Sequence, residues 1–142
     1  MALKYMLDTD MFSYVVNNRY PGLRERFVEN KDSLCLSSIT YAEAMYGARK
    51  KGSERLESYI GLFSELIEIV PWQADDAAVY ADIRVRLEKD GLPIGGDDML
   101  IAASARRRGL VLVTNNQNHF SRVDGLKLEN WIAAKNTESA AE

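Results

Sequence analysis

Short apolar segments alternate along this chain with longer segments whose apolar residues have helical spacing. Strands that alternate with helices favour a mostly parallel β-sheet with helices on both faces. We expect strands over residues 3–7, 34–37, 66–70, 110–114 and 126–129. We expect helices over residues 11–18, 21–29, 39–50, 53–65, 74–89 and 97–108. The sequence therefore predicts an α/β fold with a three-layer α/β/α arrangement.

Two of these helices carry further expectations. Asp10 can act as the N-cap of the first helix, because a carboxylate there can accept a backbone N–H. The first helix is therefore expected to begin after Asp10.

In the helix over 74–89, one side is formed by small apolar residues, namely Ala77, Ala78, Ala81 and Val85.

Length and charge limit the class of protein. A chain of 142 residues is expected to form one domain, which we place over residues 1–133, followed by a disordered tail over 134–142. Apolar residues never run together for the 18 positions of a membrane span, so we expect no membrane association and a cytoplasmic protein. The single Cys35 excludes an internal disulfide. A net charge of −3 argues against a strongly basic nucleic-acid coat but leaves local basic patches open.

Polar residues that could carry chemistry occur where the predicted strands end. Asp8 follows the first strand, Glu43 lies early in the helix after the second, Asp98 begins the helix before the fourth, and Asn116 follows the fourth. In an open parallel sheet, ligands bind at this edge. Three carboxylates gathered there would repel one another unless protons or cations neutralise them, and oxygen ligands favour Mg²⁺ or Mn²⁺. Each acid alone could equally be a helix cap or a solvated side chain.

Four motifs together resemble a known family. They are Met-Leu-Asp-Thr-Asp at 6–10, Ser-Ser-Ile-Thr-Tyr-Ala-Glu at 37–43, Pro-Ile-Gly-Gly-Asp-Asp at 93–98, and Val-Thr-Asn-Asn at 113–116 followed by Phe120. In this order and spacing the chain resembles PIN-domain ribonucleases of the VapC toxin type from Tyr5 to Trp131. The resemblance implies a PIN-like fold and places the catalytic site on Asp8, Glu43, Asp98 and Asn116.

The resemblance also implies an activity and partners. It implies endoribonuclease cleavage of structured RNA that depends on Mg²⁺, with Mn²⁺ as a substitute, and metal ligands Asp8, Asp98 and Glu43. Some relatives of this type cut initiator tRNA in the anticodon region and so inhibit translation. It further implies a VapB-type antitoxin, whose tail lies near the first helices and presents an arginine to the acidic site, and a homodimer.

Several residues depart from the family pattern or stay open. Asp10 stands where the commonest toxin motif has asparagine, and Asp97 falls where the family usually has no catalytic acid. Asn116 stands where many relatives have aspartate, so we expect a weaker contribution from it. His119 has no visible nucleophile partner, and we interpret it as a surface or structural residue.

RNA binding would need cations and stacking surfaces near the acids. The candidate basic patches are Arg24 with Arg26, residues 49–51 and residues 106–108, and the candidate stacking residues are Tyr14, Tyr41 and Tyr46. For any one of these basic patches, a solvated helix face or a charge that suits the C-terminal end of the helix dipole is the better explanation.

Two other functions compete with the nuclease. Asp8-Thr9-Asp10 after a strand resembles the nucleophile motif of haloacid-dehalogenase-type phosphatases, in which Asp8 would form a phosphoaspartate. The second alternative is an inactive PIN domain that serves only as a binding module.

Overall fold

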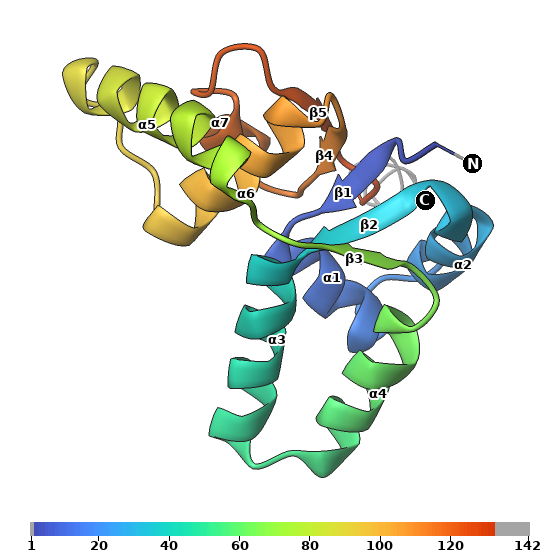
Figure 1. Cartoon of the computed structure of the whole chain (residues 1–142). Coiled ribbons are helices and arrows are strands. Elements are labelled where there is room, and N and C mark those ends of the chain that lie inside the picture. Colours follow the sequence, from blue (N-terminus) through green and yellow to red (C-terminus); the bar gives the residue numbers. More distant parts are fainter. Residues whose placement is uncertain (1, 133–142) are drawn as a thin grey trace, which may run out of the picture.

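A five-stranded sheet forms the centre of the protein. The computed structural model describes residues 2–132. In this part of the chain the strand order is β3-β2-β1-β4-β5 (Figure 1). The strands are β1 (Tyr5–Leu7), β2 (Leu34–Ser37), β3 (Glu68–Val70), β4 (Val111–Val113) and β5 (Lys127–Glu129). All four neighbouring pairs are parallel, which confirms the predicted α/β fold.

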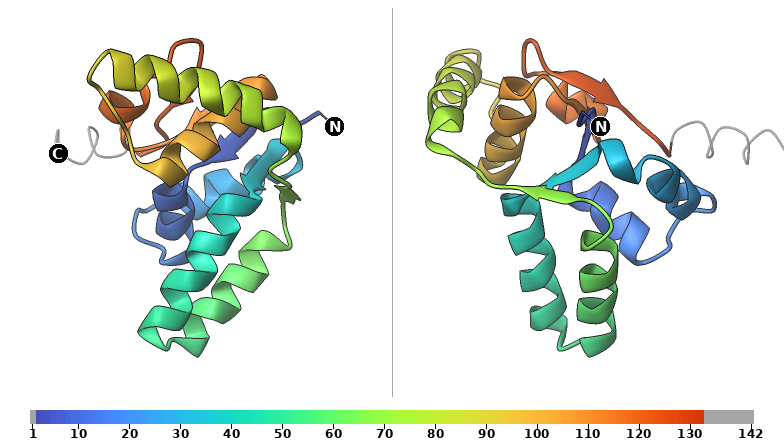
Figure 2. Two further views of the ribbon diagram at one scale, coloured as in Figure 1. Left: turned by 60° about the vertical axis from the view of Figure 1, so that its left-hand side comes forward. Right: turned by 45° about the vertical axis from the view of Figure 1, so that its right-hand side comes forward.

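Helices cover both faces of this sheet. The first four, α1 (Thr9–Val16), α2 (Leu23–Glu29), α3 (Ser38–Lys51) and α4 (Glu54–Ser64), lie on one face, and α3 and α4 project from it as a pair (Figures 1 and 2). The other face carries α5 (Ala74–Lys89), α6 (Gly96–Arg107) and the short α7 (Gln117–Phe120). A 3₁₀ turn over Lys31–Ser33 leads into β2. The predicted three layers are present.

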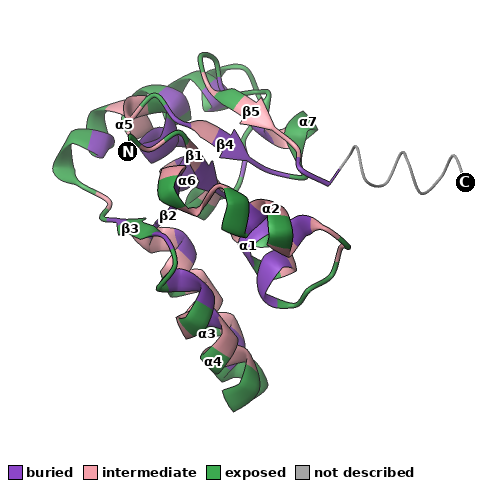
Figure 3. Ribbon diagram, turned by 90° about the vertical axis from the view of Figure 1, so that its right-hand side faces the viewer, coloured by how far each residue is buried: buried purple, intermediate pink, exposed green. Residues whose placement is uncertain are grey.

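Alternate strand residues fill two separate cores. Leu7 and Leu36 pack with the helices α1 to α4, whereas Met6, Cys35 and Leu112 pack with α5 and α6. Side chains of consecutive strand residues point to opposite faces, so a parallel strand covered by helices on both sides must be apolar throughout. The short strands β1 and β2 are accordingly almost completely buried (Figure 3).

The topology places one switch point beside β1. The chain builds β1, β2 and β3 in one direction and then crosses to the other side of β1 to build β4 and β5. Leu7 at the end of β1 pairs with Val113 at the end of β4. In open α/β sheets, ligands bind where the strand order reverses, outside the carboxyl ends of the strands. The segments that follow β1 and β4 are therefore the expected walls of a site.

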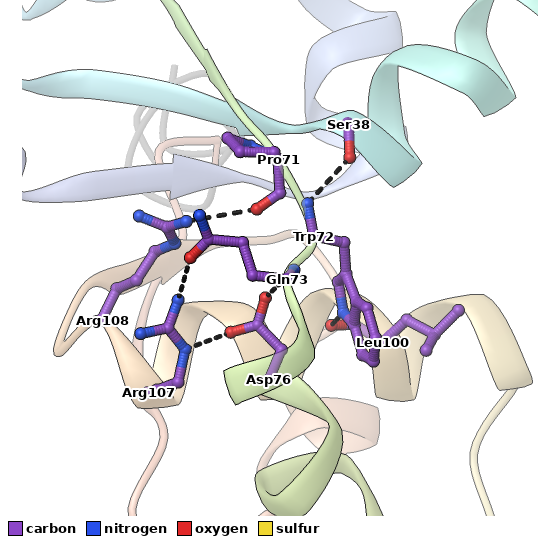
Figure 4. Close-up of polar contacts among 8 residues, drawn as sticks. All are labelled: Ser38, Pro71, Trp72, Gln73, Asp76, Leu100, Arg107 and Arg108. Atoms are coloured by element: carbon purple, nitrogen blue, oxygen red, sulfur yellow. Dashed lines mark hydrogen bonds and ion pairs between the residues drawn. The ribbon is translucent and has the colours of Figure 1, made fainter.

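A polar network joins the segment before α5 and the first turn of α5 to α6 and its C-cap residue Arg108 (Figure 4). Asp76 in the first turn of α5 is fully buried and forms an ion pair with Arg107 at the end of α6. Trp72 Nε1 donates to the backbone oxygen of Leu100 at 2.9 Å. Arg108 donates to the backbone oxygen of Pro71 at 3.2 Å. The network fixes α6, and with it the N-terminal end of α6 at the switch point.

The structure corrects three local expectations. Helix α1 begins at Thr9, and Asp8 rather than Asp10 is its N-cap. Helix α2 begins at Leu23 after the Gly22 N-cap, two residues later than Pro21 suggested, because Gly22 has a φ of 82° that a helix cannot continue. The connection after β4, for which no helix was expected, contains α7.

The exposed surface includes one side of α5. The small apolar side of α5 faces solvent, and Val85 is 64% exposed, while Ile83 and Leu87 on another side are buried. Within residues 2–132, no helix is both long and apolar enough to cross a membrane. The tail predicted to be disordered, 134–142, lies outside the described residues.

Candidate active site

Asp8 emerges directly from the end of β1. Its Oδ1 accepts the backbone N–H of Met11 at 2.8 Å, so the side chain both caps α1 and is held at the switch point. Only 4% of the residue is exposed. Burial raises the pKa of Asp8 to about 6; hydrogen bonds from Thr114 and Met11 oppose this shift, and nearby Asp10 and Asp98 add to it.

Glu43 reaches the same place from the second turn of α3. Thr9 donates its hydroxyl to Glu43 Oε1 at 2.6 Å, which ties α3 to the first residue of α1. The pKa of Glu43 is raised to about 7, first by burial and then by a side-chain contact with the Asp97 carboxyl group. The Thr9 hydrogen bond opposes this shift. Glu43 is therefore poised to exchange a proton near neutral pH.

Asp98 comes from the first turn of α6. Its Oδ2 lies 3.0 Å from Nε2 of His119, which belongs to α7. Burial raises the pKa of Asp98, the contact with His119 opposes the shift, and Asp10 and Asp97 add to it. Three acids from three helices thus share one electrostatic environment, in which each charge disfavours the others.

The four residues predicted from the sequence line a single pocket of about 170 Å³. The pocket lies at the carboxyl ends of β1 and β4. Its walls are formed by Asp8, Thr9, Asp10, Glu43, Asp98, Asn116 and Phe120. Asn116 is the exposed N-cap residue of α7, and its backbone N–H donates to the Thr114 hydroxyl at 2.9 Å. The expected convergence of Asp8, Glu43, Asp98 and Asn116 is thus present in the geometry.

Comparison with known proteins now gives the family. The PIN domain family model matches residues 5–126. The chain belongs to the PIN domain family. It is 41% identical over 130 residues to the tRNA(fMet)-specific endonuclease VapC of Shigella flexneri, covering 91% of this chain and 98% of the relative. It is 44% identical over 131 residues to ribonuclease VapC2 of Haemophilus influenzae, covering 92% of this chain and 99% of the relative.

Solved structures agree with this assignment. The structure of VapBC2 from Rickettsia felis bound to a promoter DNA fragment matches with a TM-score of 0.82 and 36% identity, over 92% of this chain and 99% of that chain. DNA-bound VapBC from Salmonella typhimurium matches with a TM-score of 0.81 and 37% identity, over 91% of this chain and 98% of that chain. This PIN domain is therefore a nuclease of the VapC type, and the phosphatase alternative is wrong.

Sequence reasoning missed four residues around the acids of this PIN domain. Thr9 and Thr114 donate to carboxylates, Asp97 contacts Glu43, and His119 contacts Asp98. The prediction that His119 is a surface or structural residue overlooked its contact with a site acid. Asp97 could have been suspected from its position beside Asp98 in the first turn of a helix. For His119 no sequence signal existed, because the contact depends on how α7 packs.

Most arginines proposed for phosphate binding already have protein partners. Arg24 donates to two backbone oxygens at the end of α1, at 2.8 and 2.7 Å. Arg26 pairs with Glu129 at 3.6 Å and Arg49 pairs with Glu57 at 2.9 Å. Two arginines of the 106–108 patch belong to the network of Figure 4. Within the described residues, these patches mainly hold the fold together.

The candidate aromatic surfaces also differ from one another. Tyr14 packs edge-on against Tyr20 with ring centroids 5.2 Å apart, and Tyr41 packs against the core. Tyr46 is 66% exposed. Of the three candidates, Tyr46 offers the most open surface for an unpaired base.

The donor set fits a hard divalent cation. Within residues 2–132, no three Asp, Glu, His or Cys side chains are already gathered around one point. Each acid is instead turned toward a protein donor, and the pKa of each is raised. Carboxylate oxygens in one pocket, with negative charge that the neighbouring groups do not neutralise, are the ligands that Mg²⁺ and Mn²⁺ prefer.

Proposed function

We propose that this protein is a metal-dependent endoribonuclease toxin that cleaves structured RNA. The observation that carries the proposal is the convergence of Asp8, Glu43 and Asp98 in one pocket of a VapC-type PIN domain. Initiator tRNA, cut in the anticodon region, is the first candidate substrate, because a relative covering nearly the whole chain is named as a tRNA(fMet)-specific endonuclease. Cleavage of initiator tRNA would inhibit translation.

The acids have distinct roles in this proposal. Asp8 and Asp98 would be the main ligands of the cation, with Glu43 in support; Mg²⁺ is the expected ion and Mn²⁺ a substitute. The cation, when bound, polarises the scissile phosphate and lowers the pKa of the attacking water. In the metal-free protein, burial and the Asp97 carboxyl group raise the pKa of Glu43, so a bound cation would favour its charged form. Asn116 orients the phosphate or water through its neutral amide.

An antitoxin partner follows from the neighbouring groove. A hollow of about 150 Å³ between α1, α3 and α4 shares Thr9, Asp10 and Glu43 with the acidic pocket. We propose that a VapB-type antitoxin lays its tail here and presents a cation to the acids, as solved relatives are VapBC complexes. Met11 and Val15 are fully buried and serve the core rather than this surface, whereas Phe12, which is also buried, lines the hollow. We further propose that the toxin is a cytoplasmic homodimer.

Cleavage assays on defined RNAs test the nuclease directly. The purified protein is incubated with initiator tRNA and elongator methionine tRNA, with Mg²⁺, with Mn²⁺ and with EDTA. We expect cuts that require the cation and disappear in Asp98→Asn. The matched control is Asp82→Asn, which removes an exposed carboxylate from α5 and should cleave like the wild type.

Two outcomes would contradict parts of the proposal. Cleavage that continues in EDTA or in Asp98→Asn would remove the acidic pocket from the mechanism. Specific tRNA binding without any cleavage, in every cation tested, would instead favour the inactive binding module.

A further inference from the structure

We propose that His119 is a positioning residue that orients the Asp98 carboxylate for the cation. The inference rests on the proposed function, because it concerns the ion that Asp98 would hold. His119 is not itself among the residues that line the acidic pocket. It lies behind Asp98, with Nε2 3.0 Å from Asp98 Oδ2. An imidazole in this place acts on the cation through the carboxylate.

The contact with His119 involves only one of the two carboxylate oxygens of Asp98. When the Asp98 carboxylate is ionised it can only accept, so this contact requires an Nε2–H on His119 that donates to Oδ2, and Oδ1 is the oxygen left without this hydrogen bond. Gly95 packs on the same side, since a Cβ on Gly95 would lie 3.6 Å from Oδ2. Oδ2 is therefore committed to the protein, and the carboxylate cannot rotate freely. A carboxylate fixed in this way offers a single, oriented oxygen to a metal ion.

One short segment after β4 holds two of the acids at once. Thr114 hydrogen-bonds to Asp8 through its side chain, and the same hydroxyl accepts the backbone N–H of Asn116 at 2.9 Å. The backbone N–H of His119 then donates to the backbone oxygen of Asn116 at 3.2 Å. Residues 114–119 thus connect the hydrogen bond to Asp8 with the hydrogen bond to Asp98. This connection sets the spacing of the two proposed ligands.

Packing gives His119 a fixed orientation. Phe120 is 1% exposed and anchors α7 in the core. The rings of His119 and Phe120 meet edge to face, with centroids 5.3 Å apart. The His119 side chain is 22% exposed, so its ring is largely enclosed. The imidazole therefore has little freedom to leave Asp98.

A partner that hydrogen-bonds to a carboxylate ligand fixes the orientation of the ligand and so strengthens its hold on the cation. Hydrogen-bond partners behind metal ligands typically change metal affinity by about 10- to 100-fold.

Direct measurement of Mn²⁺ binding tests this role without relying on activity. The full-length protein is titrated with Mn²⁺ while the EPR signal reports the free ion. His119→Leu removes the donor, His119→Gln keeps an N–H group that can reach Asp98, and Gln117→Leu is the matched control on the exposed side of α7. We expect His119→Leu to bind Mn²⁺ about 10- to 100-fold more weakly, with most of the affinity restored in His119→Gln. The control should bind like the wild type.

The outcomes separate this inference from the proposed function. Wild-type Mn²⁺ affinity in His119→Leu would overturn the positioning role while leaving the cation site intact. Equal weakening in His119→Leu and His119→Gln would also overturn it and indicate that the imidazole binds the ion directly. If the wild type binds no Mn²⁺, the metal-dependent function itself fails. Melting temperatures in EDTA that match the wild type would show that each variant is folded.

Discussion

Two buried carboxylates begin helices in this protein, but their surroundings carry opposite charge. Asp76 in α5 and Asp8 before α1 each accept a backbone N–H at 2.8 Å. Asp76 forms an ion pair with Arg107, whereas the charged groups that shift the pKa of Asp8 are Asp10 and Asp98. Asp8 accepts its N–H as the N-cap of its helix and Asp76 as the third residue of its helix, so both cap a helix N-terminus and the main difference lies in charge compensation. Arg107 compensates the charge of Asp76 within the protein. For Asp8, we propose that a cation from outside compensates the charge.

The largest expected effect is the loss of the compensated pair. Arg107→Leu leaves Asp76 buried without its partner, and breaking a buried pair from one side typically costs about 3–5 kcal/mol. Urea denaturation measures the change in the free energy of unfolding. Arg84→Leu, which removes an exposed arginine paired with Glu88, should change it far less, because exposed ion pairs contribute little to stability. Equal losses in the two variants would mean that Asp76 does not depend on Arg107.

Removing the charge of Asp8, which has no compensating cation in this comparison, should stabilise the protein instead of destabilising it. Asp8→Asn keeps an oxygen that can accept the Met11 N–H but removes the charge, so the metal-free protein should become more stable at pH 8. A pKa raised from 3.8 to about 6 means that the native state binds the proton more tightly than the unfolded state. Stability contributed by this proton is therefore lost as pH rises through that window, by about 1–3 kcal/mol.

Denaturation in EDTA at several pH values checks this sign. The stabilisation by Asp8→Asn should be full at pH 8 and shrink as pH falls from about 6 toward 4. Asp75→Asn serves as the control, because it removes an exposed carboxylate from the first turn of α5. A destabilised Asp8→Asn variant at pH 8 would contradict the idea that Asp8 carries an uncompensated charge.

A bound divalent cation should compensate the charge of the acidic pocket, as Arg107 compensates the charge of Asp76. Saturation with Mn²⁺ at about 100 times its Kd should stabilise the wild type by about 2.7 kcal/mol, because the ion binds only the folded state. Arg107→Leu should gain the same amount, since its acidic pocket is intact. The double variant Asp8→Asn, Asp98→Asn should gain little. Melting curves with Mn²⁺ and with EDTA measure these shifts, and an equal shift in the double variant would place the ion elsewhere.

Much of the fold could be predicted because its signals are local. Continuous apolar runs gave the strands, and the helix over 74–89 was predicted with the limits that α5 has. Whether the alanine side of α5 would be buried or exposed could not be decided from the sequence, because small apolar residues tolerate both core and surface. Whether Asp8 or Asp10 caps α1 was also out of reach, since both can accept a backbone N–H.

In the site, the residues that line the pocket could be predicted from the sequence, whereas the groups that support them could not. Asp8, Glu43, Asp98 and Asn116 follow from strand ends and family motifs, and the structure brings them into one pocket. The groups that support them depend on tertiary packing. The partner of Asp98 comes from α7, 21 residues away, and the hydroxyl donor to Glu43 lies 34 residues away at Thr9. Such pairs leave no periodic pattern in a sequence.

The smallest predicted effect concerns that hydroxyl. Thr9→Val removes the donor to Glu43 at 2.6 Å while keeping the shape of the side chain, and a hydrogen bond of this kind contributes about 1 kcal/mol or less net. In the wild type, the Thr9 hydrogen bond opposes the rise in pKa that burial and Asp97 cause. The pKa of Glu43 should therefore rise further above its usual range in Thr9→Val. An NMR titration of the Glu43 carboxyl carbon measures the pKa, with Thr9→Ser as the control that keeps a hydroxyl. An unchanged or lower pKa in Thr9→Val would mean that Thr9 does not stabilise the charged form. In that case the negative charge of the acidic pocket would depend on a bound cation even more than the comparison of Asp8 with Asp76 implies.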